Sequence, residues 1–145
     1  MTNEYLNNPE YSSGVAAFEE KNFSLAMQYL SPLADAGDAD AQHRVAIMCQ
    51  NGLGVVRNEV RAYKMMLAAA EQGYAIAQHG IGFMYLEGDC VEQDSAKAAE
   101  WFRKAADQGL AGSLTTLALM YEQGNGVEKD PAMAKKLYAE AGFEF

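Results

Sequence analysis

The chain contains little of what stabilises small secreted proteins. Its 145 residues include two cysteines, three prolines and one tryptophan. Cys49 and Cys90 form neither a C-x-x-C pair nor a regular ladder, so we expect reduced thiols and a cytoplasmic protein. No apolar run approaches the length of a membrane span, and the chain does not begin with a basic segment followed by an apolar one. We therefore expect neither a membrane protein nor a secretory signal.

Positive charge is also scarce, since 11 Lys and Arg face 20 Asp and Glu, for a net charge of −9. Such a charge repels phosphate backbones and anionic membrane surfaces, so we expect no nucleic acid and no membrane as a partner. It is compatible with a basic or mixed-charge protein partner, and equally with a role in solubility alone. The apolar half of the chain is rich in Ala, Met and Tyr, which favours packed helices over sheet.

What the chain does contain is a repeat of 36 residues, present in three copies over residues 39–145. A period of this length is typical of stacked helix pairs, and such arrays usually present a binding surface. Six positions are identical in all copies: Ala39/Ala75/Ala111, Met48/Met84/Met120, Gly52/Gly88/Gly124, Val55/Val91/Val127, Ala62/Ala98/Ala134 and Ala69/Ala105/Ala141.

Each copy predicts two helices joined by a glycine-containing loop. In the first copy, apolar residues recur at helical spacing up to Gly52, whose left-handed conformation would end the first helix. Asn58 would then cap the second helix, as would Asp94 and Asp130 in the other copies. Cys90 replaces the second glycine of the Gly-x-Gly loop, so we expect strain there.

Residues 9–38 predict a divergent fourth unit. A helix would begin at Asn8-Pro9, a turn would follow at Lys21-Asn22, and a second helix would end at Gly37. Pro32 lies inside this second helix and is expected to kink or split it. The prediction is an all-α fold of four antiparallel helix pairs, or eight helices, in one repeat domain over residues 9–145. Its units are 9–38, 39–74, 75–110 and 111–145, and residues 1–8 would form a flexible tail.

The second copy resembles the Sel-one-like repeat (SLR) family, a branch of the tetratricopeptide-repeat superfamily. The resemblance rests on Ala75 through Gln78, Met84-Tyr85, Gly88, Val91, Asp94, Lys97-Ala98, Trp101-Phe102 and Gln108-Gly109. It implies a right-handed α-solenoid and an adaptor or scaffold protein, often in bacterial signalling or host interaction. It supplies no catalytic residue and no cofactor. A cysteine-rich branch includes members that bind or cleave penicillin-like compounds, but this chain lacks the paired cysteines of that branch.

The same resemblance implies that one side of each first helix lines an inner groove. On a helical wheel this side lies opposite the stripe of Ala41, Val45 and Met48. Ile47, Phe83 and Leu119 share one repeat position, so they form either a row of apolar contacts in the groove or part of the core between repeats. The candidate partner-binding residues are Asp40, His43, Ile47, Gln50, Ile76, His79, Phe83, Leu86, Thr115, Leu119 and Glu122, with Gly112 on the same side.

Neither metal binding nor catalysis is predicted. His43 and His79 occupy the same repeat position, but zinc requires three or four ligands and the third copy offers only Thr115. No serine, threonine or cysteine stands in an evident motif with a histidine and a carboxylate. We therefore expect a chain that is not an enzyme and holds no cofactor.

The preferred hypothesis is a scaffold or adaptor that binds a peptide or protein segment in the groove. One alternative is an enzyme that binds or hydrolyses β-lactams, like the cysteine-rich branch. Another is a homodimer joined through the C-terminal end, where Phe143 and Phe145 follow the last predicted helix directly. That end would be covered either by these two residues or by a second chain.

Overall fold

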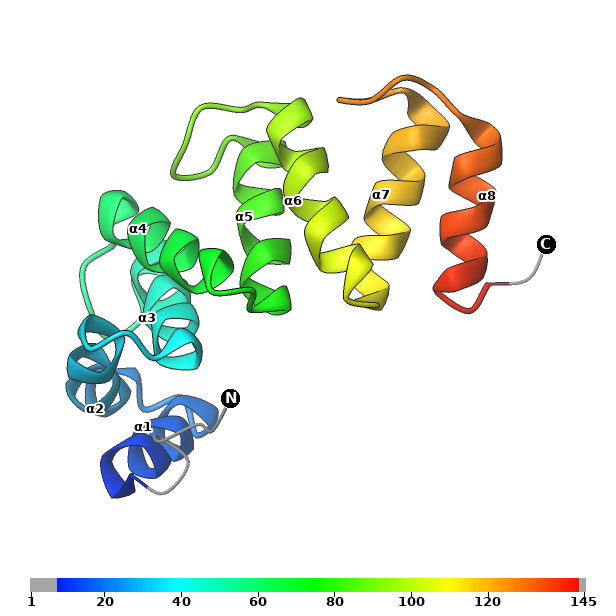
Figure 1. Ribbon diagram of the computed structural model, residues 1–145. Coiled ribbons are helices and arrows are strands. Elements are labelled where there is room, and N and C mark those ends of the chain that lie inside the picture. The colour runs from blue at the N-terminus through cyan, green and yellow to red at the C-terminus, as the bar shows by residue number, and fades with distance from the viewer. Residues whose placement is uncertain (1–7, 144–145) are drawn as a thin grey trace. The chain divides into compact units, whose positions relative to one another are not determined.

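The structure, a computed structural model, describes residues 8–143 and consists of eight helices in four consecutive pairs (Figure 1). It contains no strand within this range, which confirms the predicted all-α repeat fold. The part of the predicted N-terminal tail at residues 1–7 lies outside the described residues. The helices are α1 (Pro9–Glu19), α2 (Phe23–Asp35), α3 (Ala39–Asn51), α4 (Glu59–Glu71), α5 (Ala75–Glu87), α6 (Ser95–Asp107), α7 (Ala111–Gln123) and α8 (Pro131–Glu140).

The chain divides into two compact units, Met1–Gln72 and Gly73–Phe145. Unit 1 contains α1 to α4 and unit 2 contains α5 to α8, and within each unit every helix packs against the next one in sequence. None of the described helices combines the length and the apolar character needed to cross a bilayer.

The predicted start and stop signals are confirmed. The side chains of Asn58, Asp94 and Asp130 each accept a hydrogen bond from the backbone N–H three residues further on, at the beginning of α4, α6 and α8. The first helices α3, α5 and α7 end at glycines in the left-handed conformation, as predicted: Gly52, Gly88 and Gly124.

Of the expected effects of Pro32, a kink or a split, the split is wrong. Helix α2 runs without interruption from Phe23 to Asp35, with Pro32 inside it. Pro32 falls in the last turn, where its missing N–H removes one helical hydrogen bond and little helix remains to be disrupted.

The core of each unit consists of small residues packed around a few large ones. The predicted stripe of Ala41, Val45 and Met48 is completely buried in unit 1. In unit 2 the largest fully buried side chain is Phe102, and its ring occupies the space beside Gly82. A Cβ atom added at Gly82 would lie only 2.7 Å from that ring, so the glycine is required for this contact.

The loop between paired helices approaches the preceding helix pair through its second glycine. A Cβ atom at Gly126 would lie 2.4 Å from the carbonyl oxygen of Ser95, the first residue of α6. Gly54 makes the equivalent approach in unit 1, 2.4 Å from the carbonyl carbon of Phe23 at the beginning of α2. The third residue at this repeat position is Cys90, whose φ of 67° places a non-glycine residue in the left-handed region, as expected.

In two of the repeats, a pair of glutamines forms a clamp that is not among the predicted contacts. In unit 1 the amide nitrogen of Gln72 donates to the carbonyl oxygen of Gly37 and to the side-chain oxygen of Gln42. In unit 2 Gln108 bonds in the same way to Gly73 and Gln78. Each clamp therefore ties the C-terminal end of a repeat's second helix to the beginning of its first helix.

Replacing Gly126 with alanine should destabilise unit 2 strongly, because the new methyl group would clash with backbone that cannot rotate away. We expect a loss of about 3 kcal/mol or more in the free energy of unfolding. The matched control is Gly109→Ala, since Gly109 also has a positive φ but no atom within 4 Å of its Cβ position. The control should lose only about 1 kcal/mol. Urea titration followed through the fluorescence of Trp101, the single tryptophan, measures both, and equal losses would contradict the steric explanation.

Replacing Cys90 with glycine should stabilise unit 2 by about 1 kcal/mol, because the left-handed backbone costs glycine little. Cys90→Ala removes the thiol but keeps the Cβ atom, and it should leave the urea midpoint unchanged. An equal gain in both variants would mean that the thiol, and not the backbone conformation, is the unfavourable group.

Candidate partner-binding surface

The predicted partner-binding residues lie on the less buried sides of α3, α5 and α7, and none of them is fully buried. The exposed members are Ile76, Leu119 and Glu122. The half-buried members are Asp40, His43, Ile47, Gln50, His79, Phe83, Leu86 and Thr115. We call these eleven residues the first-helix face; its α3 residues belong to unit 1, and its α5 and α7 residues belong to unit 2.

In unit 1, Asp40 is part of an internal network that joins α1 to α3. The phenol of Tyr11 donates a hydrogen bond of 2.7 Å to the Asp40 carboxylate, and Arg44 approaches the same oxygen at 2.9 Å. The guanidinium of Arg44 also lies over the ring of Phe18, 4.9 Å from its centre. Burial and the hydrogen bond to Asp40 raise the pKa of Tyr11. Asp40 therefore holds two helices together and is less available to a partner than its position on the wheel suggests.

In unit 2, His79 connects α5 to α6 and α7. Its Nδ1 lies 2.7 Å from the hydroxyl oxygen of Ser113, and its ring packs edge-on against Phe83 and Phe102. The ring centres of Phe83 and Phe102 are themselves 5.0 Å apart. Gly112 leaves room for the imidazole, since a Cβ atom there would lie 3.3 Å from its Cε1. Phe83 is thus half-buried and packs against the fully buried ring of Phe102.

Leu119 and Ile76 are the most accessible apolar side chains of the first-helix face. They are 44% and 46% exposed, whereas Leu117 and Ile81 on the opposite sides of the same helices are 1% or less exposed. Among the three residues that share one repeat position, Leu119 is exposed, while Ile47 and Phe83 are half-buried. Of the two interpretations of this row, contacts in a groove or core between repeats, the exposure of Leu119 fits the first, whereas Ile47 and Phe83 are partly packed and partly accessible.

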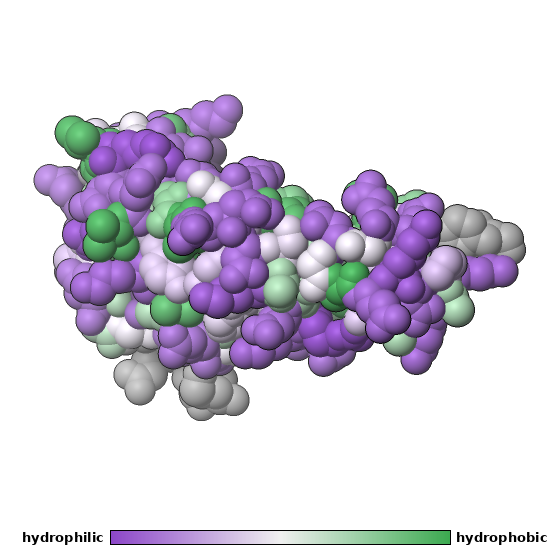
Figure 2. Space-filling model, turned by 90° about the horizontal axis from the view of Figure 1, so that it is seen from above, coloured by the Kyte–Doolittle hydropathy of each residue, from purple (hydrophilic) through white to green (hydrophobic). Residues whose placement is uncertain are grey.

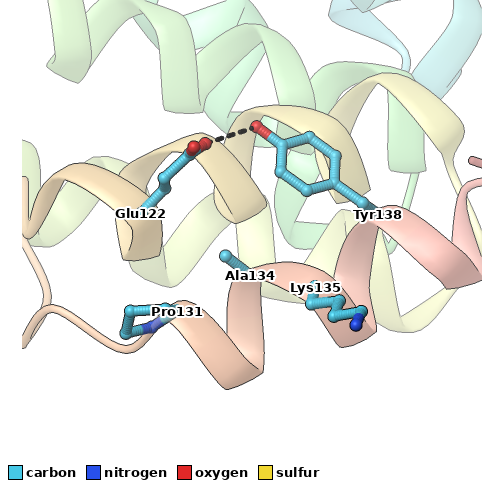
Figure 3. A pocket seen from close by; sticks show the side chains of 5 residues that line it. All are labelled: Glu122, Pro131, Ala134, Lys135 and Tyr138. Atoms are coloured by element: carbon cyan, nitrogen blue, oxygen red, sulfur yellow. Dashed lines mark hydrogen bonds between the residues drawn. The ribbon is translucent and has the colours of Figure 1, made fainter. Parts of the chain in front are cut away.

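Glu122 lies at the edge of a hollow of about 330 Å³ between α7 and α8 (Figure 3). The phenol of Tyr138 points toward Glu122 and donates a hydrogen bond of 3.1 Å to its carboxylate. Burial raises the pKa of Tyr138, and the hydrogen bond to Glu122 raises it further. The hollow is lined by Glu122, Pro131, Ala134, Lys135 and Tyr138. Sequence reasoning identified Glu122 but missed the four residues from α8.

The His79–Ser113 pair has the residue types of a base and a nucleophile, but its geometry does not suit catalysis. Ser113 is completely buried, so its hydroxyl does not face a substrate. The repeat provides a signal for the hydrogen bond between His79 and Ser113. Ser113 occupies the repeat position of the buried residues Ala41 and Ala77, and a hydroxyl buried at that position requires a hydrogen-bond partner. Within residues 8–143 no three His, Cys, Asp or Glu side chains are grouped to hold a metal ion.

Acidification should destabilise unit 2 through His79. Burial lowers the pKa of His79 below its usual value, so the unfolded chain binds a proton more readily than the folded one. The contribution of neutral His79 to the free energy of unfolding is therefore fully present above the unfolded pKa of about 6.5. It is lost as the pH falls toward the lower pKa of the folded state. His79→Gln keeps a hydrogen-bonding group near Ser113 but does not titrate. Thermal unfolding followed by Trp101 fluorescence between about pH 7.5 and 5 should show a smaller decrease in this variant; an equal decrease would exclude His79 as the cause.

The comparisons with known proteins agree with the all-α repeat fold. The profile of the Sel1 repeat matches residues 11–38, 39–74, 75–110 and 113–142. Comparison of the sequence with curated proteins finds no match.

Solved structures of similar fold include a Sel1 repeat protein from Oxalobacter formigenes, with 30% sequence identity and a TM-score of 0.84 over 90% of this chain and 54% of that one. The protective antigen c5321 of uropathogenic Escherichia coli, which has an SLR fold, is also 30% identical, with a TM-score of 0.84 over 94% of this chain and 31% of that one. The chain thus spans about half and about a third of these two proteins.

Helicobacter pylori cysteine rich protein B shares the fold, with a TM-score of 0.64 and 18% identity over 95% of this chain and 94% of that one. The family profile covers nearly all of residues 11–142 in four consecutive matches. With four profile matches and four helix pairs, the chain belongs to the Sel1 repeat family.

Proposed function

We propose that this chain is a protein-interaction module that binds a peptide or protein segment on the part of its first-helix face that belongs to unit 2. Sel1 repeat proteins generally mediate interactions between proteins. The observation that carries the proposal for this chain is the accessibility of large apolar side chains on that face, led by Ile76 and Leu119. Isolated exposed apolar residues are common, but here two of them lie on the same side of the first helices α5 and α7 of one unit, which suits a docking surface.

In unit 2 the apolar residues are bordered by polar ones. Thr115 and Glu122 lie on α7 with Leu119, and His79 lies on α5 with Ile76. This arrangement of apolar contacts within a polar border suits a partner segment with two or more apolar side chains at helical or extended spacing. Glu122 would favour a basic residue in that segment.

The polar character of the surface supports a selective contact over non-specific hydrophobic association. On the side of the molecule shown in Figure 2, hydrophilic residues predominate and hydrophobic ones form small, separate patches. With a net charge of −9, the chain would repel most acidic proteins and favour basic or mixed-charge segments. The two free cysteines, one of them fully buried, suit a reducing compartment such as the cytoplasm.

The alternative function, an enzyme that binds or hydrolyses β-lactams, receives less support. The hydroxyl of Ser113, which is bonded to His79, is buried, and burial raises the pKa of Cys49, which makes that thiol a poor nucleophile. The likeness to Helicobacter pylori cysteine rich protein B concerns the fold alone.

The test is a selection of peptides from a random display library on the purified chain, followed by affinity measurements with the enriched peptides. We expect enrichment of apolar residues together with Lys or Arg. Ile76→Asp and Leu119→Asp should each weaken binding by roughly tenfold or more, because each places a charge where an apolar side chain would dock.

The matched control is Val60→Asp, which makes the same change at a residue that is 71% exposed on α4, outside the first-helix face. It should leave affinity unchanged, and circular dichroism should show native helicity in all three variants. Peptides whose affinity is unaffected by Ile76→Asp and Leu119→Asp would show that they bind elsewhere and would overturn the proposal.

A further inference from the structure

The loop between α7 and α8 contains a residue pair that is prone to chemical change. Asparagine is a thermolabile residue, and a glycine that follows it has no side chain to keep its backbone nitrogen away from the asparagine side chain. The chain contains two such pairs, Asn51-Gly52 and Asn125-Gly126. Both asparagines are exposed to solvent, so their hydrogen bonds and backbone, and not their exposure, distinguish them.

The fold protects the first pair. Asn51 is the last residue of α3, and its side-chain nitrogen donates a hydrogen bond of 2.9 Å to the carbonyl oxygen of Ile47. The N–H of Gly52 donates to the carbonyl oxygen of Met48. The backbone of Asn51 is therefore held in the helical conformation, and the nitrogen of Gly52 is already engaged. A reaction between the two residues would first require the last turn of α3 to open.

The second pair lacks this protection. Asn125 and Gly126 lie beyond the end of α7, in the loop drawn in orange in Figure 1. The backbone N–H of Asn125 donates to the carbonyl oxygen of Met120. Within residues 8–143, neither the side chain of Asn125 nor the N–H of Gly126 forms a hydrogen bond. Both reacting groups are therefore available without the loss of a hydrogen bond.

We propose that Asn125 is a site of spontaneous deamidation, and that the isoaspartyl product of this reaction loosens the contact between the α7–α8 loop and α6. In the first step, the backbone nitrogen of Gly126 gives its proton to solvent and attacks Cγ of Asn125. The new C–N bond closes a succinimide ring, and the side-chain nitrogen leaves as ammonia after taking up a proton from solvent.

Water then opens the ring at either of its two carbonyl carbons. If the bond between Cγ and the nitrogen breaks, the product is aspartate with an ordinary backbone. If the bond between the backbone carbonyl carbon and the nitrogen breaks, the product is isoaspartate, whose main chain runs through the side chain. The overall reaction consumes one water molecule, releases one ammonia molecule and adds one negative charge to the loop.

The isoaspartyl product does not fit the contact that this loop makes. Its main chain contains one additional carbon atom before Gly126 and is longer there by one C–C bond, about 1.5 Å. Gly126 lies so close to α6 that a Cβ atom added to it would be 2.4 Å from the carbonyl oxygen of Ser95. A longer chain before Gly126 must therefore displace it from Ser95 or strain the backbone of the loop.

The aspartyl product, in contrast, fits the loop. Asp89 occupies the same repeat position as Asn125 in the preceding copy. The N–H of Asp89 donates to the carbonyl oxygen of Met84, and the N–H of Asn125 donates to that of Met120, both at 2.9 Å. The lengthened backbone, and not the new charge, is therefore the change that disturbs unit 2.

This inference goes beyond the proposed function and does not depend on it, because both of its measurements use the chain without any peptide. The first measurement is a time course of warm incubation of the full chain in neutral buffer. Peptide mapping with electron-transfer fragmentation, which distinguishes isoaspartate from aspartate, follows both asparagines. Asn125 should deamidate about tenfold or more faster than Asn51, because Asn51 must first lose two hydrogen bonds.

Incubation in guanidinium chloride provides the matched control, because the unfolded chain protects neither pair. The rates at Asn51 and Asn125 should become similar there. Equal rates in the folded chain would overturn the proposal. A difference that persists unchanged in the unfolded chain would contradict its structural basis.

The second measurement is the urea midpoint of unit 2, followed through the fluorescence of Trp101. After incubation, a fraction of the chain equal to its isoaspartyl content should unfold at a lower urea concentration. Asn125→Asp carries the charge without the longer backbone and should keep the original midpoint. Asn125→Gln cyclises far more slowly and should keep its own midpoint through the same incubation. An isoaspartyl fraction that unfolds at the original midpoint would overturn the proposed effect, as would an equal loss in incubated Asn125→Gln.

Discussion

The structure depends on how closely consecutive helices approach one another. Alanines at fixed repeat positions, such as Ala62 and Ala98, are completely buried and keep the helix axes near each other. Gly126 and Gly54 extend the same constraint to the backbone, where the loop of one helix pair touches the first residues of the preceding second helix. Large residues such as Phe102 then fill the remaining space. Everything outward from this core, including the first-helix face, is positioned by these contacts.

Much of this arrangement could be predicted from the sequence, because the signals are local. Asn58, Asp94 and Asp130 cap the helices that follow them, and Gly52, Gly88 and Gly124 end the helices that precede them. These effects involve neighbours within a few residues, and the repeat presents each of them three times. Pro32 was the exception, since its effect depended on its exact distance from the end of α2.

The candidate sites were less predictable, because they depend on contacts between residues far apart in the chain. A helical wheel gives the direction of Asp40 but does not show that Tyr11, 29 residues earlier, binds it. Likewise, the repeat places His79 on the first-helix face, whereas its bond to Ser113 and its contact with Phe102 draw it toward the core. That the first-helix face binds a partner stays a prediction.

The glutamine clamps have a consequence for how such a protein grows. Gln72 closes on Gly37 and Gln42, and Gln108 closes on Gly73 and Gln78, so every partner of a clamp lies within one stretch of 36 residues. A duplication or deletion of one such stretch would carry both hydrogen bonds of its clamp with it, although the buried Gln42 amide also donates to the carbonyl oxygen of Ala34 in the preceding repeat. The stretches 37–72 and 73–108 are therefore units by which the length of the array can change while the hydrogen bonds of the clamps are kept.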